Sequence, residues 1–269
     1  MKLGLEGKVA IVTGATANIG RAIALDLAAE GVKLIAVGRD EQAGERLILQ
    51  AKERGAQTAA FVRTDMLHPD SPAKILNAAK PFGPVRVLVN NVGGNVGAGL
   101  FVNSDPATWQ GDIDISLMTT LRMTHAVLPG MIAQQGGRII NMGSTAGLVG
   151  DYMLPLYSVA KAAVHGFTRV LAKEVGQHGI TVNCVAPYGT LSDDPADFSK
   201  GSRFAKDGFF SKAFAGSSAE DAARRQRTSP LKRFLAKPEE VSAAVLYLTS
   251  SHADFVTGQV LTVDGGTLL

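Results

Sequence analysis

Short apolar runs rich in β-branched residues recur along the chain and predict the strands of a sheet. Their apolar character is largely continuous, with little alternation between apolar and polar positions, which is typical of strands covered on both faces. The predicted strands are residues 8–13, 33–37, 58–62, 85–90, 138–142, 180–185 and 259–263.

Windows with a helical pattern separate these runs, as at residues 19–30, 155–176 and 238–250. Pro238, followed by two glutamates, marks the start of the last window, because proline is tolerated in the first turn and carboxylates suit its positive end. The alternation predicts an α/β fold, a doubly wound parallel sheet with helices on both faces. No linker rich in Pro, Gly or Ser divides the sequence, so we expect one domain over residues 1–269.

Residues 191–236 interrupt this rhythm after the sixth predicted strand. They are rich in Asp, Ser, Lys, Arg, Phe and Ala and contain no clear strand. Long inserts are usually functional or mobile, and in an open α/β sheet the carboxyl ends of the strands line the ligand crevice. We therefore expect this insert to be a lid over a substrate site.

Composition and charge narrow the classes of partner. Of 269 residues, 46% are hydrophobic and 30 are glycine, which suits a packed α/β protein with many tight turns. The net charge of +3 reflects 27 basic against 24 acidic residues and gives no support to a nucleic-acid partner. The single cysteine, Cys184, lies in an apolar stretch, as expected of a core residue in a reducing cytosol.

The sequence shows neither a secretory signal nor a membrane span. Glu6 and Lys8 break the first apolar run, and no window approaches the roughly 18 apolar residues of a spanning helix. We expect a cytoplasmic protein with no membrane partner.

A glycine loop, T-G-A-T-A-N-I-G at residues 13–20, follows the first predicted strand and opens a helix. Gly14 permits a tight turn, and Gly20 permits close packing of helix on strand. The first N–H groups of the helix then face a pyrophosphate. This context predicts phosphate binding, with a plain turn as the alternative.

Three patterns together resemble the short-chain dehydrogenase/reductase family, in its single-domain ketoreductase branch. They are the glycine loop, N-N-V-G at residues 90–93, and Ser144 placed thirteen residues before Y-x-x-x-K at residues 157–161. The resemblance extends from Leu5 to residue 266. It implies a Rossmann domain, a nicotinamide cofactor, a Ser-Tyr-Lys active site and a homotetramer.

Several positions depart from the family pattern. Asn18 replaces the middle glycine of the loop; Asn tolerates positive φ, so its role is either conformational or a hydrogen bond to a phosphate or ribose. Val92 replaces an alanine in N-N-V-G. Pro187 is followed by Tyr188 in place of glycine, and Tyr188 either contacts nicotinamide or substrate or packs at the strand end.

The end of the second predicted strand bears on the choice of cofactor. Gly38 stands where NAD-selective members of the family carry an acid, and Arg39 follows it. A guanidinium can hold a 2′-phosphate through a charged bidentate contact, so NADP(H) is favoured over NAD(H). Asp40 turned inward would favour NAD, and Arg39 as a solvated turn residue is the other alternative.

The resemblance implies further cofactor contacts. Asp65 matches the acid that accepts from the adenine amino group, although it can also cap the next turn. Thr190 matches the residue that contacts the carboxamide. The remaining positions are Thr16, Ile19, Met66, Asn91, Val92, Gly93 and Pro187, together with Tyr157 and Lys161.

The predicted chemistry is hydride exchange between nicotinamide and a ketone or secondary alcohol. Tyr157 can supply the proton, but a free tyrosine titrates near 10. Lys161 lies one helical turn on, so its charge favours tyrosinate and lowers that pKa. The hydroxyl of Ser144 can hold the carbonyl oxygen. The alternatives are a packed tyrosine, a solvated lysine and a turn serine.

Ser116 matches a family asparagine that anchors a water in a proton relay to the lysine. Its shorter side chain either supports that relay or bonds helix backbone. The histidines show no metal-ligand spacing, and we expect no metal; they are His68, His125, His165, His178 and His252. His165 is expected to be structural.

The substrate class stays open at this point. A 3-oxoacyl reductase is one alternative, although Gln134 and Gln135 are neutral where such reductases tend to be basic. A catalytically silent NADP(H)-sensing protein is another. The basic run at 223–233 is either a solvated lid edge or an attraction for an anionic substrate. Phenylalanines spaced for an apolar lid face or a subunit contact are Phe204, Phe209, Phe210 and Phe214.

Overall fold

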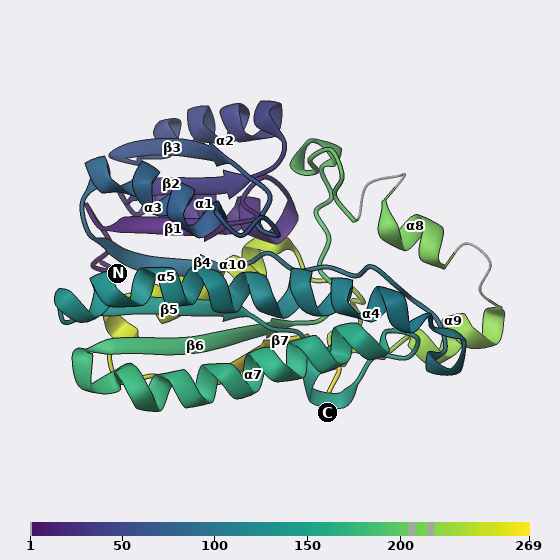
Figure 1. Cartoon of the computed structure of the whole chain (residues 1–269). Coiled ribbons are helices and arrows are strands. Elements are labelled where there is room, and N and C mark those ends of the chain that lie inside the picture. The colour runs from purple at the N-terminus through teal and green to yellow at the C-terminus, as the bar shows by residue number, and fades with distance from the viewer. Residues whose placement is uncertain (1, 204–207, 215–217) are drawn as a thin grey trace.

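A parallel sheet forms the centre of the molecule (Figure 1). The computed structural model describes residues 2–203, 208–214 and 218–269, and Phe204 therefore lies outside the described residues. Within them the sheet has seven strands in the order β3-β2-β1-β4-β5-β6-β7, and every pair is parallel. The strands are β1 Val9–Thr13, β2 Lys33–Gly38, β3 Thr58–Arg63, β4 Val85–Asn90, β5 Gly137–Met142, β6 Ile180–Pro187 and β7 Val260–Val263. The predicted doubly wound fold is confirmed.

Helices cover both faces of the sheet (Figure 1). One face carries α1 Asn18–Ala29, α2 Glu41–Glu53 and α10 Pro238–Thr249. The other carries α3 Ser71–Ala79, α5 Thr119–Ala133 and α7 Pro155–Val175. The shorter helices are α4 Pro106–Ile113, α6 Ala146–Val149, α8 Phe209–Ala213 and α9 Ala219–Arg225. In the described part of the chain, no helix is long and apolar enough to cross a membrane.

Burial explains the continuous apolar strands. Every residue of β1 and β6 is buried, because helices from both faces pack on them. A fully buried Val, Leu or Ile contributes about 1.5–3 kcal/mol relative to leaving it exposed. Cys184 is part of this buried set, and burial raises the pKa of its thiol to about 12, as expected of an unreactive core residue.

A chain of buried amides and hydroxyls ties the central strands to two helices. Asn90 Nδ2 donates to Thr124 Oγ1 at 2.8 Å and to Asn141 Oδ1 at 2.9 Å. Asn141 Nδ2 donates in turn to Thr168 Oγ1 at 3.0 Å. Buried polar groups are costly unless they are bonded, so the chain fixes α5 and α7 against β4 and β5. The helix that carries Tyr157 is thereby held relative to the strand ends.

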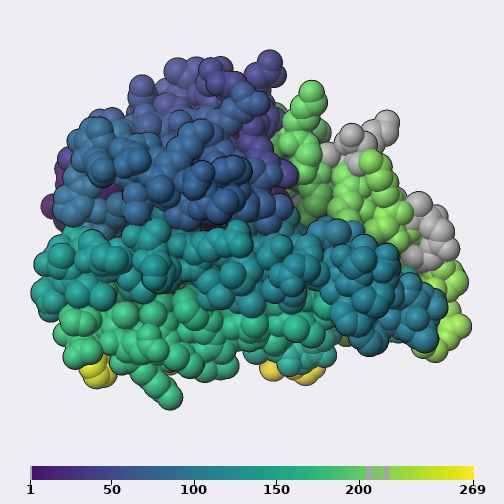
Figure 2. All heavy atoms as spheres, viewed as in Figure 1, coloured from purple at the N-terminus to yellow at the C-terminus, as the bar shows by residue number. Residues whose placement is uncertain are grey.

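The carboxyl ends of all strands meet at one edge of the sheet, and the insert after β6 stands beside that edge. Figure 2 shows the insert, in green, against the first half of the chain. Thr190 forms a parallel bridge to Ala236, so the insert leaves and rejoins the sheet at neighbouring points. The predicted start of α10 is confirmed, with Pro238 in its first turn and Glu240 capping it.

We expect Gly20→Ala to destabilise the fold. A Cβ at Gly20 would lie 2.1 Å from the carbonyl oxygen of Gly14 and 2.4 Å from Asn91 Nδ2. Overpacking of this kind costs about 1–3 kcal/mol of unfolding free energy, which urea denaturation measures. Gly166→Ala is the matched control, because a Cβ there meets nothing within 4 Å and alanine favours the α7 helix. Equal stability of the two variants would contradict the close packing.

Candidate active site

The glycine loop adopts the strained turn that its sequence predicts. Gly14 has φ +64° and Asn18 has φ +47°, so asparagine does take the conformation usually given to glycine. The Asn18 side chain also braces the insert: its Nδ2 donates to Thr190 O at 3.0 Å, and its Oδ1 accepts from Ser192 N at 3.1 Å. The conformational alternative is supported, and the bracing is a role that the sequence did not indicate.

Asn91 locks the end of β4 to the glycine loop. Its Nδ2 donates to the carbonyl oxygens of Thr13 and Gly14, each at 3.1 Å. Its backbone N–H donates to Thr13 Oγ1 at 3.0 Å. The two predicted cofactor loops therefore form one rigid wall.

A cavity of about 490 Å³ lies along this wall. It brings together many of the predicted cofactor positions, namely Gly14, Thr16, Asn18, Ile19, Gly20, Arg39, Asp65, Met66, Asn91, Val92 and Gly93. The first turn of α1 has no acidic residue, and no side chain caps it within the described residues. Its N–H groups therefore suit a pyrophosphate, and the cavity fits a dinucleotide.

The end of β2 presents Arg39 to this cavity. Arg39 Nη1 lies 3.9 Å from Asp65 Oδ2, and both side chains are about half exposed. Asp65 Oδ1 accepts from Leu67 N at 3.0 Å, which is the capping contact considered above. Asp40 also lines this cavity, but its carboxylate already has partners: it accepts from Ala43 N at 3.1 Å, as the cap of α2, and from Lys200 N at 2.8 Å.

Ser144, Tyr157 and Lys161 meet in a second, adjoining cavity of about 220 Å³. Ser144 follows β5, and the other two lie one turn apart on the buried face of α7. Lys161 Nζ lies 5.8 Å from the centroid of the Tyr157 ring and donates to Met142 O at 2.7 Å. The remaining predicted positions at this cavity are Pro187, Tyr188 and Thr190.

Nearby positive charge sets the acidity of Tyr157. Burial alone raises the pKa of its hydroxyl, but the charges of Arg203 and Lys161, with hydrogen bonding from Ser144, outweigh it. The pKa of Tyr157 therefore lies below its usual 10.0. Burial also lowers the pKa of Lys161, which the tyrosine partly opposes. A tyrosine tuned downward is suited to proton exchange near neutral pH.

Ser116 bonds backbone groups, although not those of its own helix. It lies in a π-helical turn, Asp114–Met118, and its hydroxyl donates to Gly94 O at 2.8 Å and accepts from Gly94 N at 3.1 Å. It therefore bonds the backbone of the N-N-V-G-G loop rather than that of its own helix. The contact also holds the neighbouring Gly93 close to Lys161. A Cβ added to Gly93 would lie only 2.8 Å from Lys161 Nζ, so this position has no room for a side chain.

Arg203, from the insert, is the main site residue that sequence reasoning missed. It lines both cavities, and its guanidinium lies 5.8 Å from the Tyr157 ring centroid and 5.6 Å from that of Phe210. The only signal available in the sequence was its place in a long insert at the carboxyl edge. Attention to the denser basic run at 223–233 pointed elsewhere.

That basic run is largely paired with local carboxylates. Arg224 Nη2 lies 2.5 Å from Glu220 Oε1, and Arg233 forms two bonds with Glu240, at 2.6 and 3.1 Å. Arg227 pairs with Asp151 beside the second cavity. These contacts favour a structural interpretation of the run over attraction of an anionic substrate.

Aromatic side chains of the insert pack over the site. Phe210 lies between Phe209 and Phe214, with ring centroids 5.4 and 6.0 Å away. Phe209 and Phe214 pack against the buried cluster that contains Leu154 and Tyr157. The expected apolar face is present for these three residues.

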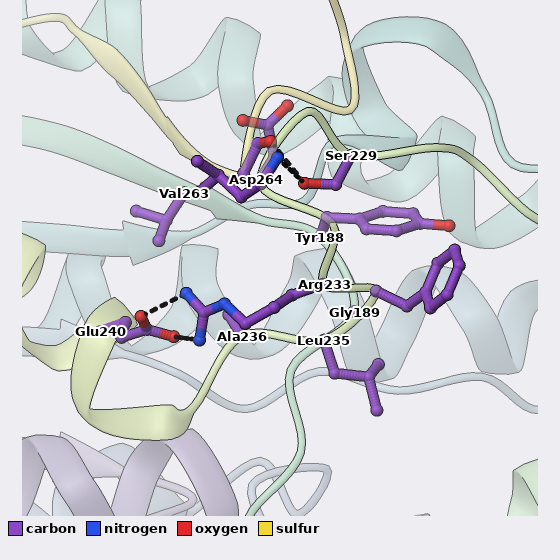
Figure 3. A pocket seen from close by; sticks show the side chains of 12 residues that line it. Tyr188, Gly189, Ser229, Arg233, Leu235, Ala236, Glu240, Val263 and Asp264 are labelled. Carbon is purple, nitrogen blue, oxygen red and sulfur yellow. Dashed lines mark hydrogen bonds and ion pairs between the residues drawn. The ribbon is translucent and has the colours of Figure 1, made fainter.

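Tyr188 stands between the second cavity and a smaller one of about 120 Å³. Figure 3 shows it beside Ser229, with the Arg233–Glu240 pair securing the far wall. Arg227 N approaches its hydroxyl at 3.4 Å. Tyr188 thus both packs at the end of β6 and faces the site. In residues 2–203, 208–214 and 218–269, no group of His, Cys, Asp or Glu is arranged to hold a metal ion.

Comparison with known proteins identifies the family. A family model described as short chain dehydrogenase matches residues 8–201. The chain belongs to the short-chain dehydrogenase family. It is therefore an NAD(P)-dependent oxidoreductase, as the Ser-Tyr-Lys cavity beside the dinucleotide cavity also indicates.

Relatives of this dehydrogenase match over nearly the whole chain. A 3-oxoacyl-(acyl-carrier-protein) reductase FabG from Vibrio cholerae is 35% identical, over 98% of each chain. An acetoacetyl-CoA reductase from an Acinetobacter species is 36% identical, over 97% of this chain and 98% of that one. A solved short chain dehydrogenase/reductase family protein has a TM-score of 0.78 at 34% identity, over 99% and 98% of the two chains.

His165 packs against the backbone at Gly143, next to Ser144, which agrees with a structural role. It is buried, and a Cβ on Gly143 would lie 2.4 Å from its Nε2. Burial, with the charges of Lys161 and Arg169, lowers the pKa of His165 from 6.5 to about 4. The folded protein thus keeps this ring neutral.

We expect His165 to lower the free energy of unfolding as the pH falls. Between pH 6.5 and about 4 the unfolded chain binds a proton that the folded chain does not. Stability is full above pH 6.5 and falls by about 3 kcal/mol as the pH drops to 4. His165→Gln, followed by urea denaturation across this range, should flatten the dependence. His125→Gln, on an exposed position of α5, is the control, and an equal effect of both variants would refute the assignment.

Proposed function

We propose that the chain is an NADP(H)-dependent ketone reductase or secondary-alcohol dehydrogenase with Tyr157 as its proton donor. The observation that carries the proposal is the convergence of Ser144, Tyr157 and Lys161 on a cavity that adjoins the glycine-loop cavity. A reduced nicotinamide, when bound, supplies the hydride for the carbonyl carbon.

The residues of the second cavity supply the proton and stabilise the negative charge that develops on the carbonyl oxygen. Ser144 holds the carbonyl oxygen through its hydroxyl, and Tyr157 donates a proton to that oxygen as charge develops on it. Lys161 keeps the tyrosine acidic and, as the loop at Gly93 is adjacent, is placed to bond a cofactor ribose. Ser116 positions this loop. Phe209, Phe210 and Phe214, from the lid at residues 191–236 of a single domain, exclude water.

The preference for NADP(H) rests on the end of β2. Arg39 faces the cavity, and no acid occupies position 38. Asp40, the residue that would favour NAD, is held by Ala43 N and Lys200 N. A 2′-phosphate beside Arg39 would gain a charge-assisted bidentate contact.

Two alternatives remain weaker. A 3-oxoacyl reductase agrees with the relatives named above, but Gln134 and Gln135 leave the edge before β5 neutral. A cofactor-sensing protein without activity disagrees with the intact Ser-Tyr-Lys set. The proposed homotetramer is supported by exposed apolar side chains on α7, Val159 and Val170, and on the edge strand β7, Leu261.

We expect Tyr157→Phe to abolish turnover. General acid catalysis contributes about 100- to 10,000-fold, so kcat should fall by about 1,000-fold while the cofactor still binds. NADPH oxidation with a panel of cyclic, aryl and 3-oxoacyl ketones measures kcat, and fluorescence titration with NADPH measures binding. Cofactor binding with no turnover by the wild type on any ketone would favour the sensing protein.

We expect Arg39→Ser to raise KM for NADPH by about 10- to 100-fold, because a charged hydrogen-bonded contact is worth about 1.5–3 kcal/mol. KM for NADH should be unchanged. Arg63→Ser, which removes an exposed arginine paired with Glu41 at the end of β3, is the control. A parallel loss with both cofactors would show that Arg39 does not read the 2′-phosphate.

A further inference from the structure

Arg203 is placed where the substrate and cofactor cavities meet. Its guanidinium lies near both the Tyr157 and Phe210 rings, and its Nη1 donates to Asn95 Oδ1 at 3.3 Å. The planar guanidinium is thus held between an amide and two aromatic rings. It reaches the reacting end of the site from a segment that is not part of the sheet.

The other cations around the second cavity are engaged differently. Arg227 pairs with Asp151, and Lys161 donates to the carbonyl oxygen of Met142 beneath the tyrosine. Asp151 is therefore neutralised locally. Among the described residues that line the cavity, the charged ones are Asp151, Lys161 and Arg203, so their formal charges leave one net positive charge.

Asn95 offers a second donor at the same junction. Its Nδ2 is buried and bonds to nothing among the described residues, although its Oδ1 accepts from Arg203. Asp112 fixes the adjacent loop by accepting from Val96 N at 2.9 Å and Gly97 N at 3.3 Å. A buried donor left unpaired costs about 1–3 kcal/mol, which a ligand oxygen would recover.

We propose that Arg203 binds a carboxylate of the substrate, with Asn95 beside it, so that the preferred substrates are oxo acids and their hydroxy acids. A carboxylate accepts two parallel N–H bonds from a guanidinium, whereas a neutral ketone offers this cation nothing beyond the oxygen that Tyr157 and Ser144 already hold. This inference rests on the proposed ketone reductase and names its substrate class.

The reach of Arg203 limits the position of the acid. Since its guanidinium lies 5.8 Å from the centroid of the Tyr157 ring, a carboxylate bound to it must lie close to the reacting carbonyl. A carboxylate bonded directly to the keto carbon, as in 2-oxo acids, or separated from it by one carbon, as in 3-oxo acids, meets this condition. The carboxylate is unchanged in the reaction: the keto carbon gains the hydride, its oxygen gains the proton, and a hydroxy acid and the oxidised cofactor result.

The test compares acids with their methyl esters, which keep the keto group and remove the charge. Acetoacetate with methyl acetoacetate and 2-oxobutanoate with methyl 2-oxobutanoate are assayed with NADPH. For the wild type we expect kcat/KM at least 10-fold higher for one of the acids than for its ester. Arg203→Met should lower kcat for acid and ester alike, because it removes a charge that lowers the pKa of Tyr157. It should raise KM for the acid alone, so that the preference in kcat/KM is lost. Arg203→Lys should retain part of it.

Calorimetry keeps the test independent of turnover. The hydroxy acids 3-hydroxybutanoate and 2-hydroxybutanoate are titrated into the wild type and Arg203→Met with NADPH present, because the reduced cofactor cannot oxidise them. Binding of one hydroxy acid by the wild type and its loss in the variant support the proposal. Arg224→Met, in α9 and paired with Glu220, is the control and should behave as the wild type.

Three outcomes would overturn the inference. The first is equal use of acids and esters by the wild type. The second is a fall of kcat/KM in Arg203→Met of equal size for acids and esters, with the pH profile shifted to higher pH, which would mean that Arg203 only tunes Tyr157. The third is a rise in KM for NADPH alone, which would assign Arg203 to a cofactor phosphate. If the wild type binds the hydroxy acid selectively but reduces no ketone, the proposed reductase fails while the anion site stands.

Discussion

The site depends on one close approach, that of the first turn after β1 to the end of β4. There is no room for a Cβ at Gly20, and Asn91 uses both hydrogens of its amide to bind the two carbonyls of the turn. Because the loops are held edge to edge, the first N–H groups of α1 and the backbone at Gly93 line one cavity. The backbone at Gly93 in turn lies against the ammonium of Lys161, one helical turn from Tyr157.

The first part of the insert, residues 191–200, is secured by residues that surround the first cavity. Arg21 on α1 binds Asp197 at 2.7 Å, and Thr16 donates to Ser199 at 3.3 Å. With the contacts of Asn18 and Asp40 described above, these bonds hold residues 190–200 along the edge of the cofactor cavity. The chain then continues directly to Arg203. The charge beside Tyr157 thus comes from a segment whose anchor points include residues that line the first cavity.

Much of the fold could be predicted from the sequence because each strand and helix start is signalled by neighbouring residues in the chain. Strands such as β1 and β6 are buried on both faces, and their sequences are therefore unbroken apolar runs. Pro238 with the two glutamates that follow it marks a helix start by itself. Ser144, Tyr157 and Lys161 could be found because their spacing combines with the family motifs. Arg203 could not, since its position depends on the path of an insert without periodicity. The contact between Ser116 and Gly94 could not be predicted either, because it depends on a π-helical turn that has no recognisable sequence pattern.

The buried chain from Thr124 through Asn90 and Asn141 to Thr168 has an evolutionary consequence. Each member satisfies a neighbour that has no access to water, so replacing one alone strands the polar group of the next. Single changes at these four positions should therefore destabilise the fold and be poorly tolerated, although none of these residues lines either cavity. Substitution at one of these positions should be tolerated only when its hydrogen-bonding partner changes as well. Residues that line the substrate cavity are not part of this chain of bonds, so they can vary without breaking it.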